Sequence, residues 1–316
     1  MPVTRTEPLI IGTRGSRLAL WQAREVQRVL QVDARVEIIR TSGDRLQKIS
    51  LQGGSTTGFF TKEIEERLLA GEIDVAVHSF KDLPTALDHR LVIAACLSRA
   101  PVSDLLLVHP DWLGDDDGLL PLRPSCVVGA GSLRRQALVR LYRPDARPEL
   151  IRGNVPTRLR KCIEGQYGAI IQARAGVERL DLDTAPLVVF ELAPDLWLPA
   201  PAQGAVAVEV RADDERARAA VAAIDHPATT AAVTLERHLL SRFEGGCHTA
   251  FGAYAWPVGD RWCAAIGIDR PGDIGWGQKT FTGERASIEV LGPDNISEMA
   301  PETVMEKEAL CRPLIR

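Results

Sequence analysis

The residues best suited to chemistry in this chain follow four apolar segments that have the composition of buried strands. Serine, arginine or lysine residues follow each segment, and after three of the four segments a helix is expected to start. Ligands of open α/β sheets bind beyond the carboxyl ends of the strands, near helix N-termini. The junctions hold Arg14 and Ser16; Ser79, Lys81 and Asp82; Ser132, Arg134 and Arg135; and Arg152 and Arg158. Their recurrence predicts a site for a ligand with several anionic groups.

Arginine at these junctions needs a physical reason, because a cation in the first turn of a helix opposes the helix dipole. A guanidinium group pairs bidentately with carboxylates and phosphates, which supplies that reason. The alternative is that these arginines form solvated surfaces or internal salt bridges. A single arginine such as Arg160 fits the alternative better, whereas the pattern at four junctions favours a polyanion site.

Asp82 is the one acid among these cations. Beside Lys81 and several arginines, we expect its carboxyl group to be ionised at neutral pH. It could then stabilise a developing positive charge or exchange protons with a substrate nitrogen. The alternative is a turn-forming aspartate before Leu83 and Pro84, and the segment KDLP by itself favours that alternative.

Cys247 follows two glycines in the segment RFEGGC, residues 242–247. One interpretation is an ordinary buried cysteine after a helix that ends at Gly245 and Gly246, and composition alone favours it. The other is a thiol that projects past the helix end as a nucleophile or covalent anchor. No histidine and asparagine pair supports a cysteine-protease arrangement, so the anchor is the better active role. His78, His238 and His248 are expected to be structural or surface residues.

The elements that must position these residues alternate between strand and helix patterns. In the N-terminal part, strands are expected at 8–13, 34–41 and 73–79, with helices at 16–30 and 61–72. A second run has strands at 103–109, 125–131, 148–154 and 167–173, with helices at 132–142 and 156–165. This order predicts two doubly wound α/β domains with mostly parallel sheets and helices on both faces.

The C-terminal part has a different pattern of expected elements. A proline-rich return at 194–202 leads into a strand that ends at 211, then two helices, strands at 249–256 and 261–268, and a last helix from about 297. We therefore expect a small α+β domain after the two doubly wound ones. The predicted boundaries are 1–104 with 203–224 for domain 1, 105–202 for domain 2 and 225–316 for domain 3.

Composition restricts the class of protein. The chain has 316 residues, 45% hydrophobic and 25% charged, which is typical of a globular protein of two or three domains. Its six cysteines are scattered without a CxxC motif, which favours a reduced cytoplasmic setting over a disulfide framework or a metal site. The N-terminal segment holds no apolar run typical of a signal peptide or membrane span. The net charge of −4 argues against a nucleic-acid partner.

Seven motifs together resemble the porphobilinogen deaminase (hydroxymethylbilane synthase) family of tetrapyrrole biosynthesis. They are GTRGSRLALWQ (12–22), TSGD (41–44), DVAVHSFKDLP (74–84), GAGSLRRQ (129–136), IRGNVPTRL (151–159), LPAPAQGAVAVE (198–209) and EGGC (244–247). They occur in the family's order and spacing, and the resemblance covers nearly the whole chain. The ordered set is far more specific than any single motif.

The resemblance implies a fold and an activity. The fold is two periplasmic-binding-protein-like α/β domains and a small α+β domain. The activity is that of a transferase that joins four porphobilinogen units head to tail on a covalent dipyrromethane primer, with loss of one ammonia per unit. Hydrolysis then releases hydroxymethylbilane. The resemblance further implies a cytoplasmic monomer that has a small-molecule substrate and neither a nucleic-acid nor a membrane partner.

The same resemblance implies roles for individual residues. Cys247 matches the cysteine that carries the dipyrromethane cofactor, one per chain, through a thioether. Asp82 matches the catalytic aspartate, which stabilises the positive charge left by loss of ammonia and helps to move protons. Cofactor or substrate carboxylates are implied to contact Arg14, Ser16, Lys81, Ser132, Arg134, Arg135 and Arg158, with second contacts from Arg152, Asn154, Arg179 and Gln203.

The chain departs from the family pattern in places. The usual loop GGKGLF is replaced by GGSTTGFF (53–60), and the REDPRDA-like stretch by RAPVSDL (99–105). Ala130 and Gly131 stand where small hydroxyl residues are common, and Gln172 and Arg174 where apolar residues are typical. Two alternatives therefore stay open. They are a non-enzymatic anion-binding protein of the two-domain clamshell type, and a slow divergent paralogue that keeps the cofactor.

Overall fold

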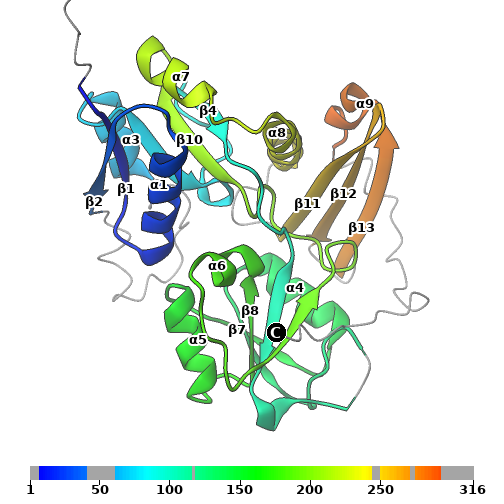
Figure 1. Cartoon of the computed structure of the whole chain (residues 1–316). Helices are drawn as coiled ribbons and strands as arrows, with labels where there is room; N and C mark the ends of the chain where they lie inside the picture. Colours follow the sequence, from blue (N-terminus) through cyan, green and yellow to red (C-terminus); the bar gives the residue numbers. More distant parts are fainter. Residues whose placement is uncertain (1–6, 41–60, 116–117, 244–249, 271–274, 293–316) are drawn as a thin grey trace, which may run out of the picture. The chain divides into compact units, whose positions relative to one another are not determined.

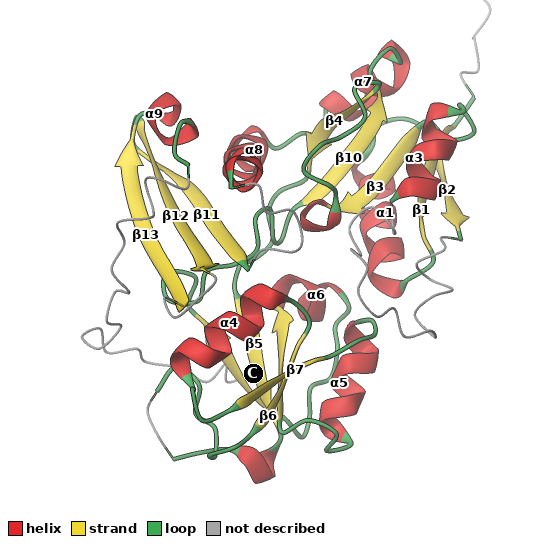
Figure 2. Ribbon diagram, turned by 180° about the vertical axis from the view of Figure 1, so that it is seen from behind, coloured by secondary structure: helices red, strands yellow, loops and turns green. Residues whose placement is uncertain are grey.

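A computed structural model describes residues 7–40, 61–115, 118–243, 250–270 and 275–292 of the chain. These residues form two compact units, and the chain passes between them more than once. Unit 1 comprises residues 1–100 and 205–231, and unit 2 comprises residues 101–204 and 232–316. Figures 1 and 2 show the elements of both units from opposite sides.

Unit 1 is built on a five-stranded sheet with the order β2-β1-β3-β10-β4 (Figure 2). Its strands are β1 (Leu9–Arg14), β2 (Ala34–Ile39), β3 (Val75–Ser79), β4 (Leu91–Cys96) and β10 (Val206–Arg211). Strands β2 and β3 are parallel to β1, whereas β10 runs antiparallel to both of its neighbours, β3 and β4. Four strands therefore point the same way, and the inserted β10 opposes them.

Helices cover both faces of this sheet because each presents an apolar stripe. Helices α1 (Arg17–Val29) and α7 (Glu215–Ala222) pack through Ala23, Val26, Ala217 and Val221 against one face. Helix α3 (Lys62–Leu69) packs through Ile64 and Leu68 against the other. The 3₁₀ turn η1 (Phe80–Asp82) follows β3 directly.

Unit 2 contains a second five-stranded sheet, with the order β7-β6-β8-β5-β9. Its strands are β5 (Asp104–Val108), β6 (Val127–Ala130), β7 (Arg147–Leu150), β8 (Ala169–Ala173) and β9 (Val188–Leu192). Strand β5 runs antiparallel to β8 and β9, and β6 is parallel to β7 and β8. Helix α4 (Leu133–Tyr142) packs on one face, and α5 (Val155–Ile163) and α6 (Arg174–Arg179) pack on the other. A short 3₁₀ turn, η2 (Pro110–Trp112), follows β5.

An antiparallel three-stranded sheet completes unit 2 (Figure 2). It consists of β11 (Phe251–Val258), β12 (Arg261–Arg270) and β13 (Gly275–Gly283). Helix α8 (Pro227–Arg242) packs against it through Leu235 and Leu239, and α9 (Arg285–Glu289) through Ile288. Ala265 and Trp276 of this sheet also join the core that covers α4, so the two sheets of unit 2 share apolar packing.

The two doubly wound, mostly parallel sheets and the small α+β part confirm the predicted fold class. The elements that sequence patterns did not predict are β4, β9, β13, α6 and α9. The helix predicted from about 297 lies outside the described residues, as do Gly245 and Gly246, where the helix before Cys247 was predicted to end. The three-domain partition stays a prediction, because compactness groups residues 232–316 with 101–204.

Candidate binding and active site

The cations and the acid predicted in unit 1 lie at one edge of its sheet. Arg14 ends β1 and Ser79 ends β3, and these strands are parallel neighbours, so their carboxyl ends lie side by side. Turn η1 then places Lys81 and Asp82 within one turn of the end of β3. Arg14 and Lys81 are half-buried, and Asp82 is exposed. The structure therefore brings a solvent-accessible carboxylate and two cations to the same sheet edge.

Two polar contacts fix this edge. The Ser16 hydroxyl caps helix α1 by accepting a hydrogen bond from the Ala19 amide at 3.2 Å. The buried Gln22 side chain on the same helix donates to the Ser79 hydroxyl at 2.9 Å. Because a serine hydroxyl that accepts a cap bond retains its own O–H donor, Ser16 can still bind an anion. Sequence patterns missed Gln22, since it sits on the helix stripe that faces the core.

A buried histidine–glutamate pair joins the neighbouring strands β3 and β10. His78 Nε2 lies 3.1 Å from Glu209 Oε2, and both side chains are buried. His78 was expected to be structural, and its position in the core agrees with that expectation. Glu209 was missed, because an acid in the mostly apolar strand β10 has no local signal for its distant partner.

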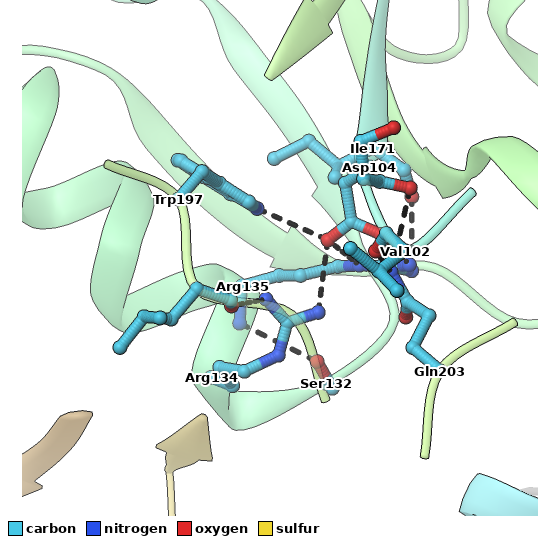
Figure 3. A network of polar contacts seen from close by, with 10 residues as sticks. Val102, Asp104, Ser132, Arg134, Arg135, Ile171, Trp197 and Gln203 are labelled. Carbon is cyan, nitrogen blue, oxygen red and sulfur yellow. Dashed lines mark hydrogen bonds and ion pairs between the residues drawn. The ribbon is translucent and has the colours of Figure 1, made fainter. Parts of the chain in front are cut away.

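Unit 2 holds a buried polar network centred on Asp104 (Figure 3). The fully buried Asp104 carboxylate accepts hydrogen bonds from Arg134 Nη2 at 2.8 Å and Arg135 Nη2 at 2.6 Å. It also accepts from Trp197 Nε1 at 3.0 Å and Gln203 Nε2 at 2.8 Å. Strand β5 runs antiparallel, so its first residue, Asp104, lies at the carboxyl edge of the sheet, opposite Ala173. This register explains how Asp104 meets the start of α4.

The charges in this network do not cancel, because two guanidinium groups face one carboxylate. Burial pushes the pKa of Asp104 upward, but the charges of Arg135 and Arg134 outweigh it and hold that pKa well below its usual range. The Arg134 Nε atom is buried without a hydrogen-bond partner among the described residues. The remaining positive charge at the start of α4 favours an anion nearby.

The same network changes how three predicted contacts are interpreted. Arg134 is only 4% exposed, Arg135 is also buried, and Gln203 is fully buried. The side chains of Arg134 and Arg135 form internal salt bridges with Asp104, which was the alternative to ligand binding, and Gln203 donates a hydrogen bond to the same carboxylate. Direct contact of these three residues with a ligand stays a prediction. Asp104 and Trp197 were not predicted as members of the site.

The remaining junctions of unit 2 lie at the carboxyl ends of the parallel neighbours β6 and β7. Ser132 caps α4 by accepting from the Arg135 amide at 3.4 Å, and Asn154 caps α5 by accepting from the Thr157 amide at 3.0 Å. Each capping side chain retains at least one donor for a ligand. Two helix N-termini with spare donors therefore lie side by side at this edge.

Three predicted arginines lie around these junctions and the nearby end of β8. Arg158 Nε donates to the Gly153 carbonyl at 2.7 Å, and its side chain is half-buried. Arg152 is exposed. Arg179, on α6, donates from Nη2 to the Gly204 carbonyl at 2.8 Å. The cationic residues that sequence patterns placed at strand ends therefore lie at the expected sheet edges.

Cys247, the predicted anchor, lies outside the described residues, as do the TSGD and GGSTTGFF segments. The cysteines within the described ranges, Cys96, Cys126, Cys162 and Cys263, are buried and free of disulfide bonds. Burial raises the pKa of both Cys126 and Cys162 to about 12. These two thiols therefore have very little thiolate near neutral pH.

We expect Cys126 and Cys162 to resist alkylation at pH 8 in the native protein and to react fully after denaturation. Their raised pKa and burial both withhold the reactive thiolate. Peptide mapping after timed treatment with a maleimide measures this directly. Modification of either residue at the rate of a free thiol in solution would contradict the assignment of both as core residues.

Among the described residues, no group of three or more histidine, cysteine, aspartate or glutamate side chains is placed to hold a metal ion. The described helices also include none with the length and apolar character needed to span a membrane.

Fold and site together define the class: an α/β protein whose sheet edges hold cations and helix N-termini, groups that suit carboxylates or phosphates. Comparison with known proteins narrows this class. Residues 9–219 match the family model described as "Porphobilinogen deaminase, dipyromethane cofactor binding domain". The chain belongs to the porphobilinogen deaminase family.

Individual relatives agree with this family. The porphobilinogen deaminase of Nitrobacter winogradskyi is 42% identical over 92% of this chain and 92% of its own length. The probable porphobilinogen deaminase of Methanosarcina acetivorans is 43% identical over 80% and 78%, and that of a Roseiflexus species is 44% identical over 80% and 83%. Among solved structures, the periplasmic VFT2 domain of Bordetella pertussis BvgS matches with a TM-score of 0.40 and 11% identity, over 68% of this chain and 86% of that chain.

Proposed function

We propose that this protein is a hydroxymethylbilane synthase, a transferase that joins porphobilinogen units head to tail with loss of ammonia. The observation that carries the proposal is the match of residues 9–219 to the cofactor-binding domain of the family. The position of Asp82 and of the predicted cations near the ends of strands within that match supports the proposal. Each pyrrole unit carries an acetate and a propionate arm, so a growing chain of units suits a site rich in guanidinium groups and helix N-termini.

The donors in this chain fit a dipyrromethane group, whose role is to prime the growing chain. We propose that Ser132, Asn154 and Arg158 of unit 2 bind its carboxylates. Arg14, Ser16 and Lys81 of unit 1 are proposed to bind carboxylates of the cofactor or of the substrate. The uncancelled charge of Arg134 and Arg135 supports an anion at the start of α4. We infer that Arg152, Arg179 and Gln203 make or support second contacts, and that Cys247 forms the thioether.

Asp82 is proposed to act on the substrate through its charge. When porphobilinogen loses ammonia, positive charge develops on the pyrrole and its methylene carbon. An exposed carboxylate next to the pyrrole N–H group stabilises that charge and can accept the N–H proton. Asp82 is suited to this role because it is exposed, directly follows a buried strand and has two cations at the same edge to bind the substrate arms.

The covalent anchor gives the most direct test of the proposed function. The purified protein should be heavier than its 34.5 kDa sequence by one dipyrrole, carried on the peptide that contains Cys247. Cys247→Ser should lose the adduct and all turnover, because a hydroxyl group forms no thioether. Intact-protein and peptide mass spectrometry measure both results.

Two outcomes of that test would favour other functions. An unmodified wild-type protein that binds dicarboxylates would favour the non-enzymatic anion-binding protein. A fully loaded protein with very slow turnover of porphobilinogen would favour a divergent paralogue. An adduct retained by Cys247→Ser would move the anchor to another residue.

We further propose that the enzyme acts as a monomer in the cytoplasm, which sedimentation and cell fractionation can measure.

A further inference from the structure

The junction between β6 and α4 contains a glycine whose presence the backbone does not explain. The φ angle of Gly131 lies outside the left-handed region, unlike that of Gly153, which is +117°. A residue with a side chain could therefore adopt the backbone conformation of Gly131. The reason for glycine must lie in the space around it.

That space is taken by the guanidinium group of Arg158. A β-carbon at Gly131 would lie 2.5 Å from Nη1, 3.2 Å from Cζ and 3.4 Å from Nη2 of Arg158. The shortest of these distances is far below van der Waals contact, so a β-carbon and this guanidinium position exclude one another. The flat group therefore lies directly against the β6–α4 turn.

A second turn fixes the other side of the same group. Arg158 Nε donates to the Gly153 carbonyl at 2.7 Å in the β7–α5 junction. Strands β6 and β7 are parallel neighbours, so both turns lie at the same sheet edge. The guanidinium group thus lies between the turns that start α4 and α5, next to the capping residues Ser132 and Asn154.

We propose that Gly131 is a positioning residue that sets where Arg158 meets a ligand carboxylate. This inference rests on the proposed function and adds to it the residue that determines this contact. A serine at this position would bring the β-carbon that Gly131 lacks. This chain is therefore expected to hold the Arg158 guanidinium closer to the β6–α4 turn than a chain with serine there.

The steric conflict predicts a functional effect with little effect on folding. The atom that must move is the far end of a long flexible side chain, which can change rotamer, so the backbone need not shift. We expect Gly131→Ala to change Tm by no more than about 2 °C. We expect it to lower kcat/KM for porphobilinogen about tenfold, mainly through KM, because the displaced guanidinium loses its alignment with the carboxylate.

A double-mutant cycle separates positioning from general disturbance. Gly131→Ala, Arg158→Gln and the double variant are compared for kcat, KM, Tm and the fraction of protein that carries the adduct. In the Arg158→Gln background no guanidinium remains to be displaced, so adding Gly131→Ala should change kcat/KM less than twofold. Gly283→Ala is the matched control, because a β-carbon there would lie 3.7 Å from Ser287 Cβ, an ordinary contact.

Two results would overturn the proposal. One is an equal loss of kcat/KM on adding Gly131→Ala with and without Arg158. The other is a crystal structure of Gly131→Ala in which the guanidinium group keeps its position. The crystal structure tests the inference even if the wild-type protein lacks adduct and turnover, which would refute the proposed function alone. If the wild type carries the adduct and is active, but Gly131→Ala has the same effect with and without Arg158, only the role of Gly131 is refuted.

Discussion

Asp82→Asn is expected to lower the rate of hydroxymethylbilane formation by about 10²-fold or more, while the protein stays folded and loaded with cofactor. Asparagine keeps the shape of the side chain but removes the negative charge and the proton-accepting oxygen. Because Asp82 is exposed and lies in a short turn, its loss should barely change packing. The measurement is turnover of porphobilinogen per mole of adduct-carrying enzyme, together with Tm.

The matched control is the same aspartate-to-asparagine change at another exposed position next to the same sheet. Asp33 is an exposed acid just before β2, at the amino end of the strands rather than at the edge with Arg14 and Lys81. Asp33→Asn should leave turnover within about twofold, since surface substitutions away from a site have small effects. Near-normal turnover by Asp82→Asn would refute the catalytic role of Asp82, whereas partial recovery in Asp82→Glu would support a need for the charge.

Asp104→Asn is expected to be the most destabilising of these substitutions, at about 3–5 kcal/mol in the free energy of unfolding. The change leaves the buried guanidinium groups of Arg134 and Arg135 without their counter-charge. It also weakens the bonds to Trp197 and Gln203, which tie the segment after β9 to β5. Urea unfolding, followed by fluorescence, measures the loss.

The control for this prediction is an exposed ion pair in the same unit. Asp145 lies 2.9 Å from Arg143 but is 45% exposed, so Asp145→Asn should cost less than about 1 kcal/mol. Equal effects of the two substitutions would contradict the assignment of Asp104 as the centre of a buried network.

Because the pKa of Asp104 differs between the folded and unfolded states, its contribution to the free energy of unfolding depends on pH. Its folded-state pKa is depressed, so its stabilisation is present above the unfolded-state value of about 3.9 and is lost as pH falls below that value. The unfolding free energy of the wild type should therefore fall more steeply below about pH 4 than that of Asp104→Asn. Parallel curves for the two proteins would show that Asp104 is not charged in the folded state.

How far the sequence predicts this site depends on how local each signal is. Strand ends such as Ser79 and helix starts such as Ser132 follow from periodicity and cap residues that lie within a few positions. Asp104 does not, because it accepts bonds from residues 30, 31, 93 and 99 positions away. Its place at the site edge depends on β5 running antiparallel, which the apolar pattern of a strand does not reveal.

A second limit is that one residue type can serve two purposes. Ser16, Ser132 and Asn154 were predicted as ligand contacts, and the structure shows each as the cap of a helix. Both roles use the same polar atoms next to a helix N-terminus, so sequence patterns cannot separate them. Gly131 is a similar case, since only the position of Arg158 shows what its missing side chain makes room for.

The place of β10 between β3 and β4 has a consequence for biosynthesis. A ribosome makes β1 to β4 first and supplies β10 only after residues 101–204 have been translated. Until then, the sheet of the nascent N-terminal segment lacks the strand between β3 and β4. The backbone N–H and C=O groups of Val75–Ser79 and Leu91–Cys96 that pair with β10 have no partner strand. Translation that stalls within residues 101–204 should therefore yield an aggregation-prone fragment that depends on chaperones.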